Sequence, residues 1–293
     1  VRATVRLIPR PAGLRTFLIS YRSLEASCEA VAIIIARGLR PAALEILDRA
    51  TIQAVEASVF RAGYPEDAEA VLLVELEGLP KALEEATAEV RDACLSPEAI
   101  DFEEADDEVS RERLWRGRKG AFGAMGRIAS DLYVLDAVVP RTRLAEAISG
   151  IQKIGLEHGV HLSNVFHAGD GNLHPNISFD AADPEQRQRV LAAGDAILRW
   201  CVGLGGTLSG EHGIGIEKQD HMHLVFSEEQ MESQRLLRKA VDVQGLANPG
   251  KILPTGRGCV EAGFRGAGHL HRTEQILGPL TKEKGVPPEG DTP

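Results

Sequence analysis

Alternation of apolar and polar residues marks several strands along the chain, and a period near 3.6 marks helices between them. The predicted strands are 16–21, 43–48, 69–78, 99–105 and 132–140. The predicted helices are 23–37, 49–60, 80–94, 108–125, 141–157 and 184–202. Several connections are too short for the crossovers that a purely parallel sheet needs. We therefore predict an α+β fold with a mixed, largely antiparallel sheet and helices on one face.

The two ends of the chain differ from this central region. The segment VRATVRLIPRP (1–11) alternates as a strand does and has no leader-peptide features. We interpret residues 1–12 as the last strand of a preceding domain and residues 13–258 as one domain. Residues 259–293 are rich in glycine, proline and charge. This composition predicts a loosely structured tail.

Composition narrows the class of protein. With 43% hydrophobic and 26% charged residues, the chain resembles an ordinary soluble globular protein. The net charge of −10 disfavours a nucleic-acid partner. The longest apolar run is too short to span a bilayer. Its four cysteines are far apart and form no CxxC, so a reduced cytoplasmic setting is expected.

Two histidines flank a turn dipeptide in NVFHAGDGNLHPNISF (164–179). If Asp170-Gly171 forms a two-residue hairpin loop, His167 faces His174 directly, with Cβ atoms roughly 4.5–5.5 Å apart. Facing imidazoles suit a divalent metal. The pair alone leaves open a plain exposed polar face with solvated histidines. Period two predicts that Ser163, Asn176 and Ser178 share the histidine face, and that Leu162, Phe166, Leu173, Ile177 and Phe179 form the apolar face.

A second segment, GGTLSGEHGIGIEK (205–218), places Glu211 and His212 among glycines. An acid here would complete a His2Glu zinc set that keeps one coordination position open. Because Glu211 and His212 are adjacent, we expect their side chains to point in different directions, with one binding metal and the other acting as a base. A flexible surface turn is the alternative interpretation of this segment.

Three segments of the sequence resemble a known enzyme family. NVFHAGDGNLHPNI, GGTLSGEHGIGIEK and LANPGKILP, in this order, resemble the C-terminal domain of FAD-linked 2-hydroxy-acid oxidoreductases, a group that includes glycolate oxidase, D-lactate dehydrogenase and D-2-hydroxyglutarate dehydrogenase. The segment LWRGRKGAFGAMGRIASDLYVLDAVVPRTRL (114–144) is most similar to the flavin-carrying subunit of bacterial glycolate oxidases. The likeness spans about residues 1–258 and implies the ferredoxin-like cap of such oxidases, preceded by an FAD-binding domain.

The resemblance also implies roles for single residues. It implies metal binding by His167, His174 and Glu211, catalysis by His212, substrate binding by Arg118 and Asn176, and flavin contact by Asn248. In hydroxyglutarate-type relatives, a threonine one turn after the arginine and a lysine on the next strand hold a second carboxylate. Here the corresponding places are Phe122 and Val134–Leu135. A small monocarboxylic 2-hydroxy acid is therefore the expected substrate.

The implied function is the substrate- and metal-binding half of a flavin-dependent 2-hydroxy-acid oxidoreductase. It would oxidise glycolate to glyoxylate, with FAD held mainly by another domain and a zinc-like divalent ion in the cap. The implied partners are an FAD-binding domain or subunit and further glycolate oxidase subunits, including an iron–sulfur subunit. The implied location is the cytoplasm, and peripheral attachment of the assembly to the inner membrane is compatible with these partners. The alternative is a non-catalytic, truncated assembly module that contacts partner subunits.

Overall fold

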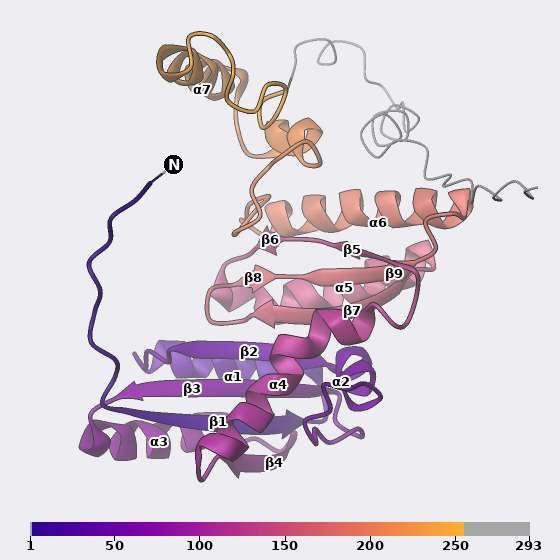
Figure 1. Cartoon of the computed structure of the whole chain (residues 1–293). Coiled ribbons are helices and arrows are strands. Elements are labelled where there is room, and N and C mark those ends of the chain that lie inside the picture. Colours follow the sequence, from indigo (N-terminus) through magenta and orange to yellow (C-terminus); the bar gives the residue numbers. More distant parts are fainter. Residues whose placement is uncertain (1, 255–293) are drawn as a thin grey trace, which may run out of the picture. The chain divides into compact units, whose positions relative to one another are not determined.

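The computed structural model describes residues 2–254, which form helices on a single large sheet (Figure 1). The strands are β1 (Gly13–Tyr21), β2 (Ala43–Asp48), β3 (Ala70–Gly78), β4 (Ala99–Glu104), β5 (Asp131–Val134), β6 (Ala137–Val138), β7 (His161–His167), β8 (Asn172–Leu173) and β9 (Pro175–Phe179). The helices are α1 (Leu24–Ala36), α2 (Arg49–Glu56), α3 (Pro80–Cys94), α4 (Glu108–Met125), α5 (Leu144–His158), α6 (Pro184–Gly203) and α7 (Glu228–Val241), with 3-10 turns at Arg141–Arg143 and Gln219–Leu224.

The sheet has the order β4-β1-β3-β2-β7-β8-β6, and β9 pairs with both β5 and β7. Every strand pair within the described residues is antiparallel. The first four strands and helices α1 and α3 follow a βαββαβ arrangement with strand order 4-1-3-2, which is the ferredoxin-like pattern. Pairing of β2 with β7 joins this half to the hairpin that carries the two histidines.

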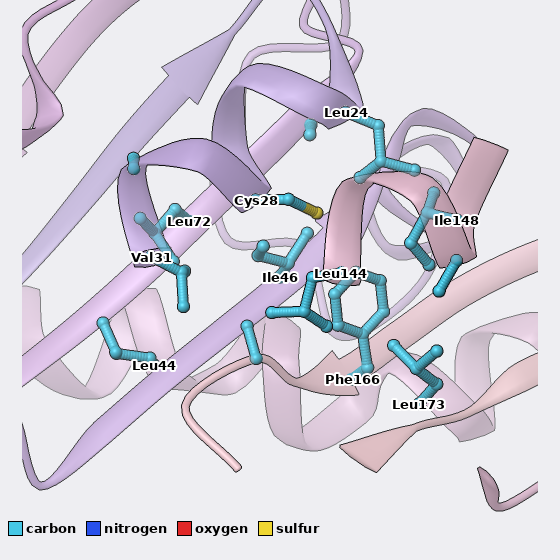
Figure 2. Packing of buried hydrophobic residues seen from close by; sticks show 14 of the residues in the cluster. Leu24, Cys28, Val31, Leu44, Ile46, Leu72, Leu144, Ile148, Phe166 and Leu173 are labelled. Carbon is cyan, nitrogen blue, oxygen red and sulfur yellow. The ribbon is translucent and has the colours of Figure 1, made fainter. Parts of the chain in front are cut away.

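Two apolar clusters lie on opposite faces of the sheet. The larger packs α1, α3, α5 and α6 against residues such as Phe17, Ile46 and Phe166. Figure 2 shows its centre, where Phe166 lies among Leu144, Ile46 and Leu173. The other packs α2 and α4 against alternate residues of the same strands, such as Leu47 and Val165. In Figure 1, α4 crosses the strands on one side, with α1 and α5 behind them.

The predicted fold class is confirmed, but its description needs one correction. The sheet is largely antiparallel, as the short connections indicated. The expectation that helices occupy one face is wrong, because α2 and α4 cover the other. Strands buried on both faces read as near-continuous apolar runs, as AVLLVELEG in β3 does, so period two did not reveal the second layer.

Local sequence patterns predicted most of the helices and strands correctly. The hydroxyl of Ser23, the N-cap of α1, accepts a hydrogen bond from the backbone N–H of Ala26 at 3.2 Å. The predicted strand 132–140 is interrupted and forms β5 and β6. Helix α7 was not anticipated.

The predictions for the chain ends have different outcomes. Residues 2–11 form no strand in the structure, and the proposed tail at 259–293 lies outside the described residues. Within residues 2–254, no helix combines the length and the apolar character that crossing a bilayer would need.

Candidate functional site

The predicted histidine hairpin forms, but with a longer loop and a different register. His167 pairs with Asn172 rather than with His174, so residues 168–171 make a four-residue loop. The direct pairing expected from a two-residue loop is therefore wrong. His167 and His174 are diagonal neighbours on one face of the sheet, and their ring centroids are 5.4 Å apart. The predicted apolar face is confirmed, since Phe166, Leu173 and Ile177 lie in the larger core cluster.

The loop that carries Glu211 and His212 is organised around the buried carboxylate of Asp136. That carboxylate accepts hydrogen bonds from the backbone N–H groups of Gly210, Glu211 and His212 at 3.1, 3.3 and 3.0 Å. The Ser209 hydroxyl and the Lys218 ammonium donate to it at 2.5 and 3.2 Å. The loop is thus folded around one buried anion, which its backbone N–H groups and two side chains contact.

Asp136 stands where the strand after α4 breaks. The pairs Val134↔Asn176 and Ala137↔Leu173 flank it, so the register places Asp136 opposite His174. Burial alone would raise the pKa of Asp136. The Ser209 hydroxyl, the Lys218 charge and the backbone donors outweigh burial and hold this pKa well below its usual range. Asp136 is therefore an ionised carboxylate next to the histidines.

Three imidazoles converge on one carboxylate oxygen. Glu211 Oε1 lies 3.1 Å from His174 Nε2, 3.4 Å from His212 Nε2 and 3.9 Å from His167 Nε2. The expectation that Glu211 and His212 point in different directions is wrong. The tight loop around Asp136 brings both side chains to the same point, and the rings of His174 and His212 stack with centroids 5.1 Å apart.

The protonation pattern at this point favours a cation. His174 Nδ1 lies 3.1 Å from the carbonyl oxygen of Leu135, which can only accept, so Nδ1 carries the proton and Nε2 presents a lone pair. That lone pair faces the Glu211 carboxylate. Two acceptors facing each other need a positive charge between them, either a proton or a metal ion. His167, His174 and Glu211 offer ligand atoms within 4.8 Å of one another, as do Asp136, His174 and His212.

The two strand histidines have opposite electrostatic environments. The hydrogen bond to Glu45 raises the pKa of His167. Burial lowers the pKa of His174, whose side chain is 2% exposed. His174 is therefore disposed to be the neutral imidazole that a metal ion requires.

Arg118 is buried at the edge of the site. Its Nε donates to Glu45 Oε2 at 2.8 Å, and Glu45 Oε1 lies 2.8 Å from His167 Nδ1. Neither terminal guanidinium nitrogen of Arg118 makes a hydrogen bond within the described part of the chain. Arg118 thus keeps the two donors that bind a carboxylate side by side. Arg118 is 8% exposed, so it does not belong to a solvated basic face of α4.

Within the described residues, neither the Asn176 nor the Asn248 side chain forms a hydrogen bond with the converging side chains. Asn176 is fully buried, and its amide donates to the carbonyl oxygen of His174 at 2.7 Å while its Oδ1 has no partner. Asn248 is exposed in the left-handed region at φ 48°. Arg238 donates to the backbone carbonyls around it, and the N–H of Ile252 bonds to Gly215, which ties this turn to the loop after His212.

A pocket of about 560 Å³ opens beside the site. Its lining includes Glu45, His167, Asp170, Arg40 and Arg141, and it does not include His174, Glu211 or His212. The pocket therefore adjoins the Nδ1 side of His167 rather than the point where the Nε2 atoms meet.

Sequence reasoning missed three residues of the site: Glu45, Asp136 and Lys218. A signal existed for Glu45 and Asp136, because each acid interrupts an apolar run, Glu45 in ALEIL and Asp136 in LYVLDAVV. Acidic residues are seldom buried without a partner, so such positions indicate a specific contact. Lys218 had no comparable signal, since a lysine at the end of a glycine-rich segment is ordinarily solvated.

Comparisons with known proteins show which proteins this chain is similar to. The chain is 43% identical over 268 residues to the glycolate oxidase subunit GlcD of Escherichia coli (strain K12), covering 92% of this chain and 54% of that protein. It is 32% identical to GlcD of Bacillus subtilis (strain 168), and the match covers 85% of this chain and 53% of that protein. It is 29% identical to a probable mitochondrial D-lactate dehydrogenase of Danio rerio, with 86% and 50% covered. The chain thus spans about half the length of these relatives.

Solved structures share the fold at low sequence identity. A 4-ethylphenol oxidase from Gulosibacter chungangensis aligns with a TM-score of 0.65 at 17% identity, covering 85% of this chain and 55% of that one. A p-cresol methylhydroxylase aligns with a TM-score of 0.63 at 14% identity, with 83% and 53% covered. The family model for the C-terminal domain of FAD-linked oxidases matches residues 10–252. With the relatives above, this match shows that the chain belongs to the family of FAD-linked oxidase C-terminal domains.

Proposed function

We propose that this chain is the substrate- and metal-binding half of a flavin-dependent 2-hydroxy-acid oxidoreductase that oxidises glycolate to glyoxylate. The observation that carries the proposal is the convergence of the Nε2 atoms of His167, His174 and His212 on Glu211 Oε1, next to a buried arginine with two unused donors. A 2-hydroxy acid presents a carboxylate and a neighbouring hydroxyl, and this set of groups matches both.

His167, His174 and Glu211 would hold a zinc-like divalent ion. The donor set of two imidazoles and a carboxylate fits such an ion and leaves a coordination position for substrate. A second support is the lone pair of His174 Nε2, which faces Glu211 Oε1, because a metal ion between these two acceptors would satisfy both. When bound, the ion would lower the pKa of the substrate hydroxyl.

The remaining side chains would handle the carboxylate and the proton. Arg118 would bind the substrate carboxylate through its two terminal nitrogens and so fix which C–H bond faces the flavin. His212, whose side chain is 46% exposed, would accept the hydroxyl proton at Nε2. Asn176 would contact the substrate through Oδ1, the polar atom of its side chain that has no partner.

FAD would accept the hydride and would be held mainly by a domain outside this chain. Asn248 would lie against its ring. Support for this contact is that Asn248 is exposed while Arg238 fixes the surrounding backbone. The full assembly would include an FAD-binding domain or subunit and an iron–sulfur subunit. It would lie in the cytoplasm or peripherally at the inner membrane.

The metal is tested by elemental analysis of this chain purified without chelators. We expect near-stoichiometric divalent metal in the wild type and its loss in His174→Ala, because that change removes the most buried ligand. His161→Ala is the matched control, since His161 lies exposed at the far end of β7 and should leave metal content unchanged. Equal metal content in wild type and His174→Ala would contradict the assignment.

A further inference from the structure

Glu45 joins two parts of the site that come from different elements. It lies on β2 directly opposite His167 of β7 in the register, and it faces Arg118 of α4. Each carboxylate oxygen has one partner at 2.8 Å: Oε1 contacts His167 Nδ1, and Oε2 accepts from Arg118 Nε. The side chain is 9% exposed, so water competes little for either bond.

We propose that Glu45 is a positioning residue that fixes the tautomer of His167 and the orientation of Arg118 together. A carboxylate can only accept hydrogen bonds, so a neutral His167 must carry its proton on Nδ1 and present the Nε2 lone pair to the point where Glu211 and His174 meet. The Leu135 carbonyl imposes the same pattern on His174. A hydrogen-bonded group behind a ligating histidine sets its orientation and its basicity.

The same carboxylate also orients the guanidinium of Arg118 for binding an anion. By engaging Nε, Glu45 leaves both terminal nitrogens of the guanidinium for a planar anion. The negative charge of Glu45 balances the positive charge of Arg118, which is buried with it. The metal ligand and the substrate clamp are thus aligned by one side chain, and this inference rests on the proposed function of the site.

The substitution Glu45→Gln separates the tautomer effect from simple loss of the side chain. Arg118 Nε–H still needs an acceptor, so the amide oxygen is expected to face Arg118 and the NH2 group to face His167. His167 Nδ1 must then accept, which moves its proton to Nε2. An N–H would point at the metal position in place of a lone pair.

Glu75→Gln is the matched control. Glu75 is a second buried acid, on β3, that binds the same helix through Arg111 and Trp115. Like Glu45, it ties the sheet to α4, but at an earlier turn of the helix. A general weakening of α4 should therefore appear in both variants, and a change in His167 should appear in Glu45→Gln alone.

The test is ¹⁵N NMR of the histidine rings in metal-free chain, at a pH high enough that the ¹⁵N shifts show a neutral His167 ring, because Glu45 raises the pKa of His167. We expect the Nδ1–H tautomer for His167 in wild type and Glu75→Gln, and the Nε2–H tautomer in Glu45→Gln. In the same spectra, Arg118 Nε–H should exchange slowly in wild type and faster in Glu45→Gln. An Nε2–H tautomer in the wild type overturns the proposal without any variant having to fold.

Zinc titration of the same three proteins gives the second readout. Loss of a group that orients a ligating histidine typically lowers metal affinity about 10- to 100-fold. We expect a fall of that size in Glu45→Gln and none in Glu75→Gln. Equal affinity in wild type and Glu45→Gln overturns the proposal. If the wild type binds no zinc, the metal part of the proposed function fails, while the NMR result still decides the role of Glu45.

Discussion

At the residue scale, Phe122 limits what can bind beside Arg118. It follows Arg118 by four residues on α4, which places both side chains on one face of the helix. The ring meets that of His174 edge-on, with centroids 6.3 Å apart, so it borders the converging imidazoles. Leu135 lies in the core. A second carboxylate here would meet apolar atoms rather than a donor.

This environment predicts a preference for small monocarboxylic acids. Burying a charged group without a partner costs about 1–3 kcal/mol or more, which corresponds to at least about fivefold in kcat/KM. With the flavin domain joined to this chain, kcat/KM for glycolate should exceed that for D-2-hydroxyglutarate by that factor, with D-lactate between them. Phe122→Thr should narrow the difference. A wild-type preference for the dicarboxylate would refute this role of Phe122.

Sequence identified which residues of the hairpin share a face, but not how they pair. Period two placed His167 and His174 together because alternation depends only on local backbone geometry. The register depends on the loop, and tertiary contacts decide it. The N–H of Gly169 bonds to the Leu44 carbonyl on β2, and Gly171, at φ 73°, lies so close to the Val139 carbonyl that a Cβ would be 2.2 Å away. Such contacts are not visible in local sequence.

At the element scale, the loop 205–218 depends on a break in the neighbouring strand. Asp136, between β5 and β6, is released from the pairing that a continuous strand would impose and is surrounded by donors from the loop. Close packing reinforces this arrangement, since a Cβ on Gly206 would lie 1.9 Å from the Val138 carbonyl. The apolar pattern of 132–140 predicted one strand because neither the break nor its partner loop has a signature of its own.

Asp136→Asn should therefore loosen the loop. The change leaves the Lys218 ammonium, which is 3% exposed, without its counter-charge. Removing one partner of a buried ion pair costs about 3–5 kcal/mol. We expect a loss of that size in urea unfolding, and faster hydrogen exchange at the backbone N–H groups of Gly210 and His212. Adding Lys218→Met removes the unpaired charge and should recover part of the stability. Unchanged exchange at both groups would show that Asp136 does not organise the loop.

At the scale of the whole molecule, the sequence predicted the architecture better than its layering. Alternating strands and helices with short connections indicate an antiparallel α+β sheet, and such signals are local. On the second face, α4 combines apolar packing with long-range ion pairs such as Arg111–Glu75 and Arg118–Glu45. These pairs join residues 36 and 73 positions apart, and neither periodicity nor composition indicates which acid meets which arginine.

The ion pair between Glu75 and Arg111 predicts how the stability of the fold changes in acid. Burial alone would raise the pKa of Glu75, but hydrogen bonds from Arg111, Thr16 and Trp115 outweigh burial and lower it. The pKa of Asp195 is also lowered, first by its hydrogen bond with His221. A carboxyl whose folded pKa is depressed stabilises the fold above its unfolded pKa of ~4. That stability is lost as pH falls through the folded value.

The free energy of unfolding of metal-free chain should therefore decline below about pH 5, as these carboxylates take up protons. Glu75→Gln should be less stable at neutral pH, because it removes the charge that Arg111 and Trp115 bind. Its stability should also fall less steeply with acid, because the group that titrates is gone. Urea midpoints measured across this range compare the two proteins, and a chelator keeps metal release out of the comparison.

Asp195→Asn should also make the free energy of unfolding depend less steeply on pH, but by a smaller amount than Glu75→Gln does. The reason is that the Asp195 side chain is 44% exposed and more screened by water. Parallel pH curves for wild type and Glu75→Gln would show that the tie between β3 and α4 does not govern acid stability.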